Sequence, residues 1–252
     1  PRPGSQVEWF EFKAIKNLSD PSWGDYLTDI ENHLHPSLGT QYRSSDKTTW
    51  AHETTHGIHS WLNNTMQKER SHYYLYVGWN KATKIKNPKF KIADVARMVP
   101  KSLQQSRYNL YLIHQQGDWN NEPVYLLDEW VAYCNGAECG IELNKKGLFK
   151  PNKNNACWGV LEFSVYASYV VMAQKKHDPN YDDNKQMLEF LAWNLERSMK
   201  LYSEGEKLDV YNWDNGKYLQ HLRTNEEAAE FRNFLIDSYG TEWANEVFGF
   251  KR

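Results

Sequence analysis

Two histidines and a glutamate in the segment His52-Glu53-Thr54-Thr55-His56 constrain this chain more than any other feature of its sequence. Residues four apart lie one above the other on an α-helix, so a helix would bring both imidazoles to one cation. Ser45 and Asp46 precede the segment as candidate N-caps. Apolar residues continue the helical spacing after it, at Ile58, Trp61, Leu62 and Met66. The sequence therefore predicts a helix over residues 47–66.

The spacing of this segment is that of a catalytic zinc site. His52 and His56 could bind zinc at about 2.0–2.1 Å, and Glu53 would project toward the open coordination position. There Glu53 could take a proton from a metal-activated water and pass it to a leaving amine. Gly57 costs a helix about 0.5–1 kcal/mol relative to alanine, which predicts close packing against this turn. The competing interpretation is a helix with two ordinary histidines.

A catalytic zinc ion normally has a third protein ligand. The extended H-E-x-x-H-x-x-G-x-x-H form is excluded, because His59 and Leu62 stand where it needs glycine and histidine. His59 itself lies seven residues after His52, a rise of about 10.5 Å, which is too far for both to bind one ion. We therefore expect His59 to support the site or to face the substrate.

A carboxylate from a later helix is the remaining candidate. Asp128 and Glu129 lie within a largely apolar helical pattern that begins at Pro123. Burying this acidic pair without a partner would cost several kcal/mol, and a zinc ion would supply that partner. We predict Glu129 as the third ligand, with Asp128 as second choice or as acceptor of a histidine N–H. Glu162, in a second apolar helix, is a reserve ligand. The pair could also be an ordinary solvated helix face.

At this point the chain resembles a known family. The segment His52–His56 with a later helical glutamate is similar to gluzincin metallopeptidases, which belong to the zincins. Glu129-Trp130-Val131-Ala132 resembles the glutamate helix of anthrax lethal factor-like peptidases. The resemblance covers about 20 residues, and it implies His52, His56 and Glu129 as zinc ligands with Glu53 as base. The resemblance also implies a side chain that stabilises the oxyanion of the reaction intermediate. Our first candidate is Tyr133, followed by Tyr125 and Tyr166. Tyr133 stands where the glutamate helix of lethal factor-like peptidases has a second acidic residue.

The order of the expected elements indicates an α+β zincin-like fold. A small mixed sheet from strands near residues 7–12 and 72–79 would cover the histidine helix. Residues 1–120 would form this mixed lobe, and residues 121–252 a helical lobe that supplies the third ligand, the two making one compact catalytic domain. Helices are expected near residues 23–34, 93–98, 123–139, 156–176, 185–202 and 226–248, the last broken at Gly240. Residues 81–91 read as a solvated loop or hairpin, 107–114 as strand or helix, and 116–123 as a loop.

Composition excludes several classes of protein. The formal charge is −2 over 252 residues, so a large nucleic-acid footprint is not expected. Aromatic residues make up 15% of the chain, which argues against global disorder. We expect no membrane span, because no stretch approaches the roughly 20 apolar residues that one needs. Cys134, Cys139 and Cys157 are too few for a disulfide scaffold and allow one disulfide or three free thiols.

These observations predict a zinc-dependent metallopeptidase that hydrolyses peptide bonds. An edge strand would hold the substrate backbone by strand addition. The substrate would be a protein or peptide, bare or glycosylated, and the protein a monomer. The alternatives are a zincin directed at glycoproteins or carbohydrates and a catalytically silent zincin-fold binding module. The chain begins at Pro1 without methionine, which we read as a processed or trimmed product. Together with the many secreted zinc peptidases, this favours a secreted protein.

Overall fold

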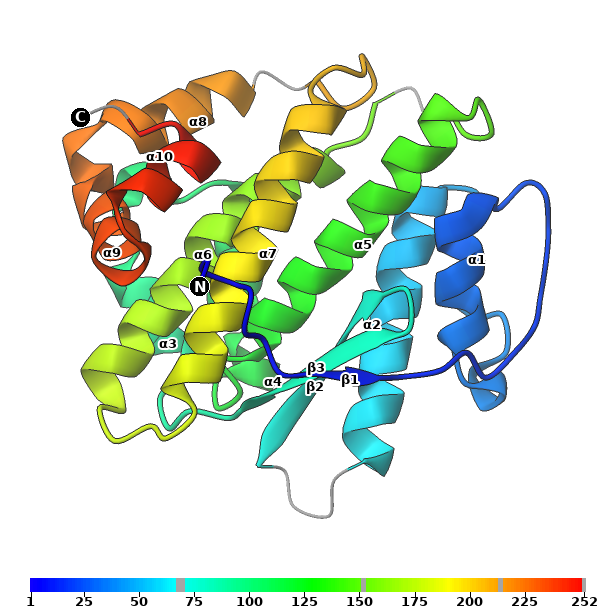
Figure 1. The fold of residues 1–252 in the computed structure, drawn as a ribbon, viewed down its shortest axis with the longest axis horizontal. Helices are drawn as coiled ribbons and strands as arrows, with labels where there is room; N and C mark the ends of the chain where they lie inside the picture. Colours follow the sequence, from blue (N-terminus) through cyan, green and yellow to red (C-terminus); the bar gives the residue numbers. More distant parts are fainter. Residues whose placement is uncertain (67–70, 151–152, 213–214, 251–252) are drawn as a thin grey trace.

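The strands lie within the first 86 residues, interspersed with helices, and helices predominate in the rest of the computed structural model, which describes residues 1–66, 71–150, 153–212 and 215–250. The structure is α+β, with a mostly helical chain and one small sheet (Figure 1). In chain order the elements are β1 (Trp9–Glu11), α1 (Gly24–His33), η1 (Pro36–Leu38), α2 (Lys47–Thr65), β2 (His72–Gly78), β3 (Lys81–Lys86), α3 (Ile92–Met98), η2 (Lys101–Leu103), η3 (Tyr108–His114), α4 (Gln116–Trp119), α5 (Tyr125–Lys145), α6 (Ala156–His177), α7 (Asn184–Gly205), α8 (Asn215–Thr224), η4 (Glu226–Ala228), α9 (Ala229–Tyr239) and α10 (Thr241–Phe248).

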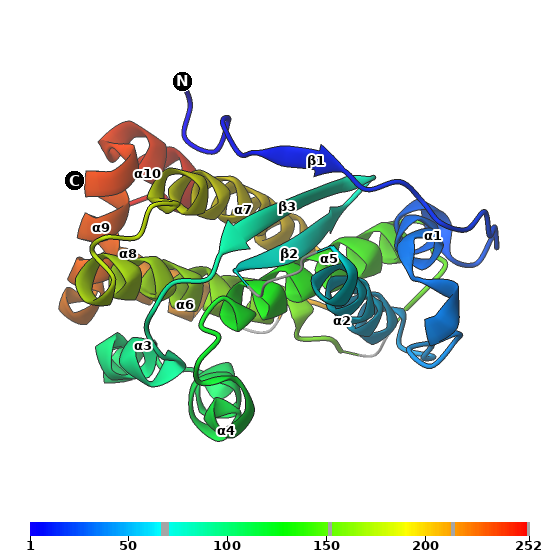
Figure 2. The same cartoon turned by 90° about the horizontal axis from the view of Figure 1, so that it is seen from below.

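The sheet has the strand order β1-β3-β2, and both pairings are antiparallel. The expected mixed sheet was therefore wrong in its strand directions. Figure 2 shows the sheet beside α2 and α5, and β2 contacts both helices. Of the two readings of residues 81–91, the hairpin is correct for β3, whose Ala82 and Ile85 are fully buried. A solvated loop is excluded there because β3 is the central strand.

Most expected helices are present, with some differences. Residues 107–114 form the π-helix η3, and the expected loop at 116–123 begins with the short helix α4. Helix α8 was not predicted, because it is short and carries few apolar residues. The break at Gly240 is confirmed: its φ of 89° lies in the left-handed region that glycine tolerates, and it separates α9 from α10.

Helix α2 begins where its sequence predicted. The Asp46 side chain accepts hydrogen bonds from the N–H groups of Thr48 and Thr49, at 3.0 and 3.3 Å. The close packing expected at Gly57 is also present. A Cβ atom there would lie 2.4 Å from the Tyr42 ring and 2.9 Å from Leu34. Glycine therefore lets the segment before α2 pack directly on the turn that follows the two histidines.

Two glycines bring α5 close to α2. A Cβ atom on Gly136 would lie 2.9 Å from the Thr48 carbonyl oxygen, and one on Gly140 would lie 2.5 Å from the Thr48 hydroxyl. The glycines are one helical turn apart, so they form a flat strip on α5 against the first turn of α2. This contact places the N-terminal half of α5 beside the histidines.

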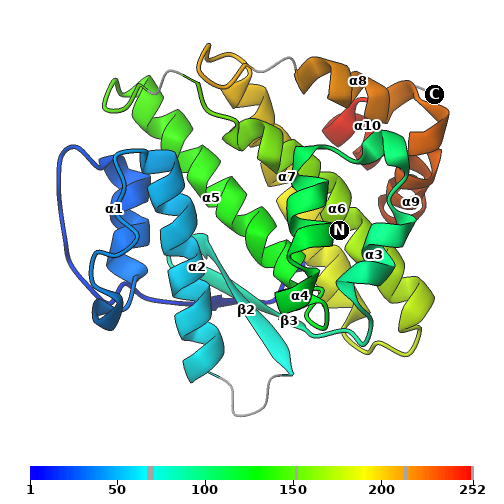
Figure 3. The ribbon, with the colours of Figure 1, turned by 180° about the vertical axis from the view of Figure 1, so that it is seen from behind.

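Helix α6 corrects the expectation that no segment is apolar enough to span a bilayer. Its 22 residues meet that description by length and composition, but nearly all of its most apolar stretch is buried inside the molecule. Figures 2 and 3 show α5 and α6 between the sheet and the segment from α3 to α4. The main hydrophobic core likewise combines side chains from both halves of the chain, for example Ile85, Trp130 and Phe190. Cys134, Cys139 and Cys157 are buried free thiols.

Candidate metal centre

The histidine pair lies on one face of α2, as its spacing predicts. The imidazole rings of His52 and His56 are 4.7 Å apart between centroids, and their Nε2 atoms are separated by 3.0 Å. Both side chains are partly buried, with 13% and 22% of their surface exposed. The two Nε2 atoms therefore point to a common position at the edge of the helix.

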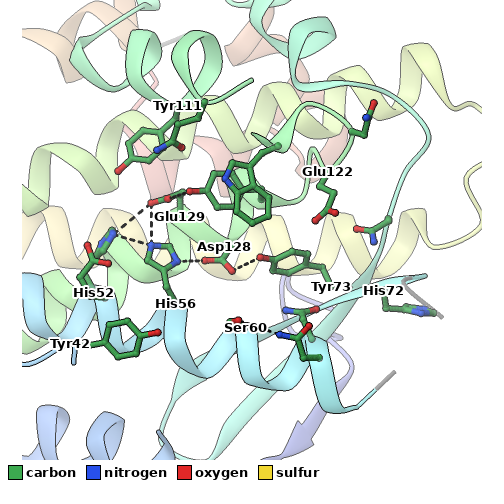
Figure 4. Close-up of a pocket in the computed structure, with 18 residues that line it drawn as sticks. Tyr42, His52, His56, Ser60, His72, Tyr73, Tyr111, Glu122, Asp128 and Glu129 are labelled. Carbon is green, nitrogen blue, oxygen red and sulfur yellow. Dashed lines mark hydrogen bonds and ion pairs between the residues drawn. The ribbon is translucent and has the colours of Figure 1, made fainter. Parts of the chain in front are cut away.

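Helix α5 adds a carboxylate at the same position (Figure 4). The Oε2 atom of Glu129 lies 3.6 Å from His52 Nε2 and 3.4 Å from His56 Nε2. This oxygen is buried and has no hydrogen-bond partner, whereas Oε1 accepts a hydrogen bond from the Tyr125 hydroxyl. All three ligand atoms lie within 4.8 Å of one another. These buried groups could hold a metal ion, which would also satisfy the unpartnered oxygen.

Asp128 orients the ring of His56. Its Oδ1 atom accepts a hydrogen bond from His56 Nδ1 at 2.5 Å, which turns Nε2 toward Glu129. Its Oδ2 atom accepts from the Tyr73 hydroxyl at 2.7 Å and lies 3.0 Å from His59 Nδ1. A second possible metal grouping joins His56, His59 and Asp128. The hydrogen bonds to Asp128 favour a supporting role for it, the alternative that the sequence left open.

His59 is fully buried behind this network. Its Nε2 atom donates to the Tyr76 carbonyl oxygen at 3.1 Å, while Nδ1 faces Asp128. It does not join the grouping of His52, His56 and Glu129. His59 thus links the sheet to Asp128, which agrees with a supporting position and not with one facing the substrate.

The pKa values of the two motif histidines shift in opposite directions. Burial, and then the neighbouring His56, hold the pKa of His52 well below its usual value, which favours the neutral imidazole that binds metals. Burial also acts to lower the pKa of His56, but Asp128 and Glu129 outweigh it and raise that pKa well above the usual value. Asp128 and Glu129 therefore favour a positive charge on the His56 imidazole.

Two cavities meet at the motif. The larger has a volume of about 760 Å³ and is lined by His52, His56 and Glu129 among others. The smaller, of about 390 Å³, lies toward the start of α2. Both are lined by His52, Glu53 and Tyr111, so the hollow extends to either side of these residues. The Glu53 side chain is exposed and borders both cavities, where it can reach a bound water or substrate.

Tyr133, the first candidate for oxyanion stabilisation, lies against the site. Its ring meets that of His52 edge to face at 4.6 Å, and Arg107 lies over the same ring. Its hydroxyl is 3.1 Å from the hydroxyl of Tyr111. Sequence reasoning missed Tyr111, because it lies on the π-helix η3, a segment whose sequence was compatible with either strand or helix. π-Helices occur often at functional sites, but the sequence carried no signal that would have identified this one.

The other sequence candidates separate into two groups. Tyr125 borders the larger cavity, and its hydroxyl is bound to Glu129. Tyr166 is fully buried and accepts a hydrogen bond from the Gln105 N–H, so it lines neither cavity. Glu162, the reserve ligand, forms a buried ion pair with Arg107 at 2.9 Å. The structure therefore does not bring the candidate Tyr166 or the reserve ligand Glu162 to the grouping of His52, His56 and Glu129.

Replacing Glu162 by glutamine should destabilise the fold without affecting metal binding. The change leaves the buried Arg107 charge without its partner, so we expect the free energy of unfolding to fall by about 3–5 kcal/mol. Urea unfolding and zinc content measure the two effects. Glu204→Gln is the control: it removes an exposed ion pair with Lys145 and should cost about 1 kcal/mol or less. A Glu162→Gln protein that folds but cannot bind zinc would contradict this prediction and indicate that Glu162 is a metal ligand.

The outer edge of β2 is occupied beside the site. Asn63 on α2 accepts from the Tyr74 N–H at 2.9 Å and donates to the Tyr74 carbonyl at 3.2 Å. The Tyr76 carbonyl accepts from His59 and from Asn135, at 3.1 and 3.2 Å. Strand addition of a substrate along this part of β2, which the sequence led us to expect, is therefore blocked by side chains of α2 and α5.

Comparisons with family models, with curated proteins and with solved structures found no match for this chain. A fold by itself does not determine an activity, which resides in the geometry and chemistry of a site. The functional assignment therefore depends on the groups that converge between α2 and α5.

Proposed function

We propose that the protein is a zinc-dependent metallopeptidase with His52, His56 and Glu129 as metal ligands. The observation that carries the proposal is the convergence of two Nε2 atoms and one unpartnered, buried carboxylate oxygen beside an exposed glutamate. Two imidazoles and one carboxylate are the ligand set of many catalytic zinc sites. The open side of this grouping faces a cleft large enough for a peptide.

The surrounding residues suit a bound divalent cation. Asp128 fixes the ring of His56, and Tyr125 fixes the carboxylate of Glu129, so two of the three ligands are held by hydrogen bonds. When bound, zinc would supply Lewis acidity, which polarises a scissile carbonyl and makes water acidic near neutral pH. The histidine nitrogens and the carboxylate favour zinc over magnesium or calcium, which prefer oxygen ligands.

The protein's own groups would handle the proton and the substrate. Glu53 is next to His52 and borders both cavities, so its carboxylate can take a proton from water and deliver it to the departing amine. Tyr111 and Tyr133 line the smaller cavity together with His52, and their hydroxyls, 3.1 Å apart, are the candidate donors to the developing oxyanion. Tyr133 remains our first candidate for stabilising the oxyanion, and the structure adds Tyr111 as a second candidate.

Metal removal tests this function. Treatment with a chelator should lower hydrolysis of a denatured protein substrate by more than about a hundredfold, because the Lewis acid contributes several kcal/mol. One equivalent of zinc should restore the rate, whereas magnesium should not. Hydrolysis that persists in protein shown to be free of zinc would contradict the proposal. Zinc bound without hydrolysis of any member of a peptide library would favour the silent binding module.

A further inference from the structure

Side chains supply most of the hydrogen-bonding groups in the wall of the larger half of the cleft. The outer edge of β2 is used by Asn63 at Tyr74 and by His59 and Asn135 at Tyr76. At Tyr74 and at the Tyr76 carbonyl, an extended peptide therefore cannot form the main-chain hydrogen bonds on which strand addition depends. Whatever binds in this half is recognised by the groups that line the cavity wall.

Apart from four carboxylates and the histidines, these groups are mostly neutral and polar or aromatic. Asn64 and Ser60 reach the cavity from α2, and Gln115 and Asn121 reach it from the segments around α4. Amides and hydroxyls both donate and accept hydrogen bonds, as sugar hydroxyl and acetamido groups do. Among the described residues that line this cavity there is no lysine or arginine. The described wall therefore suits an uncharged, hydroxyl-rich ligand better than an acidic one.

The side chain of Trp119 also lines this cavity. Trp119 is stacked on Tyr125 with ring centroids 4.2 Å apart and an angle of 7° between the planes. Trp119 is only partly buried and borders the cavity. The stack is also tied to the metal centre, because the Tyr125 hydroxyl donates to Glu129. A ring that packs against Trp119 would thus share one cavity wall with Glu129, the proposed metal ligand.

We propose that this half of the cleft binds a sugar carried by the peptide substrate, packed against Trp119 and hydrogen-bonded by the surrounding amides. The inference rests on the proposed peptidase function, because it places the sugar on a residue near the bond that is cut. A flat aromatic surface with amide groups around it binds a sugar ring through its apolar face and its hydroxyls together.

Matched peptides test the inference. A sequence cleaved by the enzyme is prepared in three forms, with one threonine bare, with O-linked N-acetylgalactosamine, or with O-linked mannose. We expect kcat/KM to be about tenfold higher for at least one glycosylated form, equivalent to one good aromatic contact with its hydrogen bonds. Trp119→Ala should reduce this ratio toward one, and Trp119→Phe should keep part of it. Trp79→Ala, which removes an exposed tryptophan outside this cavity, should leave the ratio unchanged.

Binding separates this inference from the proposed function. Affinities of the same peptides are measured by calorimetry with Glu53→Gln protein, in which hydrolysis is not required. Tighter binding of a glycosylated form that depends on Trp119 would support the sugar site even if no peptide were ever cleaved. Equal affinities and equal kcat/KM for all three forms would overturn the sugar site while leaving the peptidase intact. A ratio that survives in Trp119→Ala protein with normal zinc content would also overturn it.

Discussion

Glu53→Gln should lower kcat/KM for peptide hydrolysis by about 10²- to 10⁴-fold while zinc stays bound, because an amide cannot accept the proton from water. Glu53 is not among the three groups that converge on the metal position, and its side chain is exposed. The free energy of unfolding should therefore change by no more than about 0.5 kcal/mol. Hydrolysis of one defined peptide and the zinc content of the same sample provide the measurement.

Glu53→Asp is the matched control for this variant. It keeps a carboxylate but withdraws it by one methylene, so part of the activity lost in Glu53→Gln should return. Hydrolysis by Glu53→Gln protein at a rate close to that of the unaltered protein would eliminate Glu53 as the base.

Glu129→Ala should weaken zinc binding more than any change at Asp128. Asp128 acts through His56, and removing such a supporting contact typically costs ten- to a hundredfold in metal affinity. Glu129 offers the unpartnered oxygen itself. Its removal should therefore lower the zinc affinity by more than a hundredfold and abolish hydrolysis. Competition with a fluorescent zinc chelator measures both variants on one scale.

Glu122→Gln is the control for the Glu129 prediction, because Glu122 lines the same cavity but does not belong to the ligand grouping. Its zinc affinity should match that of the unaltered protein. If Asp128→Asn weakened zinc binding more than Glu129→Ala, the metal would instead belong with Asp128, His56 and His59, the second possible grouping.

Local signals in the sequence predicted the part of the site that lies on single helices. The Asp46 cap and the spacing of His52 and His56 act within a few residues, so they could be read without knowing the fold. The placement of Glu129 followed from the cost of an acidic residue in an apolar pattern. However, a buried carboxylate can be compensated either by a metal ion or by a basic side chain. Glu162 is an example of the second case, because its buried partner is Arg107.

Contacts between segments that are distant in the chain could not be predicted from the sequence. Gly136 and Gly140 set the close approach of α5 to α2, yet in the sequence they resemble any other glycines in a helix. Tyr111 reaches the site from a π-helix, whose periodicity matches no standard template. The hydrogen bonds of Asn63 to β2 likewise join two elements whose packing no local pattern specifies.

The position of the metal is tested most directly by an anomalous difference map recorded at the zinc absorption edge from crystals of the zinc-loaded protein. We predict one strong peak at about 2.0–2.2 Å from Nε2 of His52, Nε2 of His56 and a carboxylate oxygen of Glu129. A peak bound by Asp128 and His59, or no peak between α2 and α5 in protein that contains zinc, would contradict the proposed metal centre.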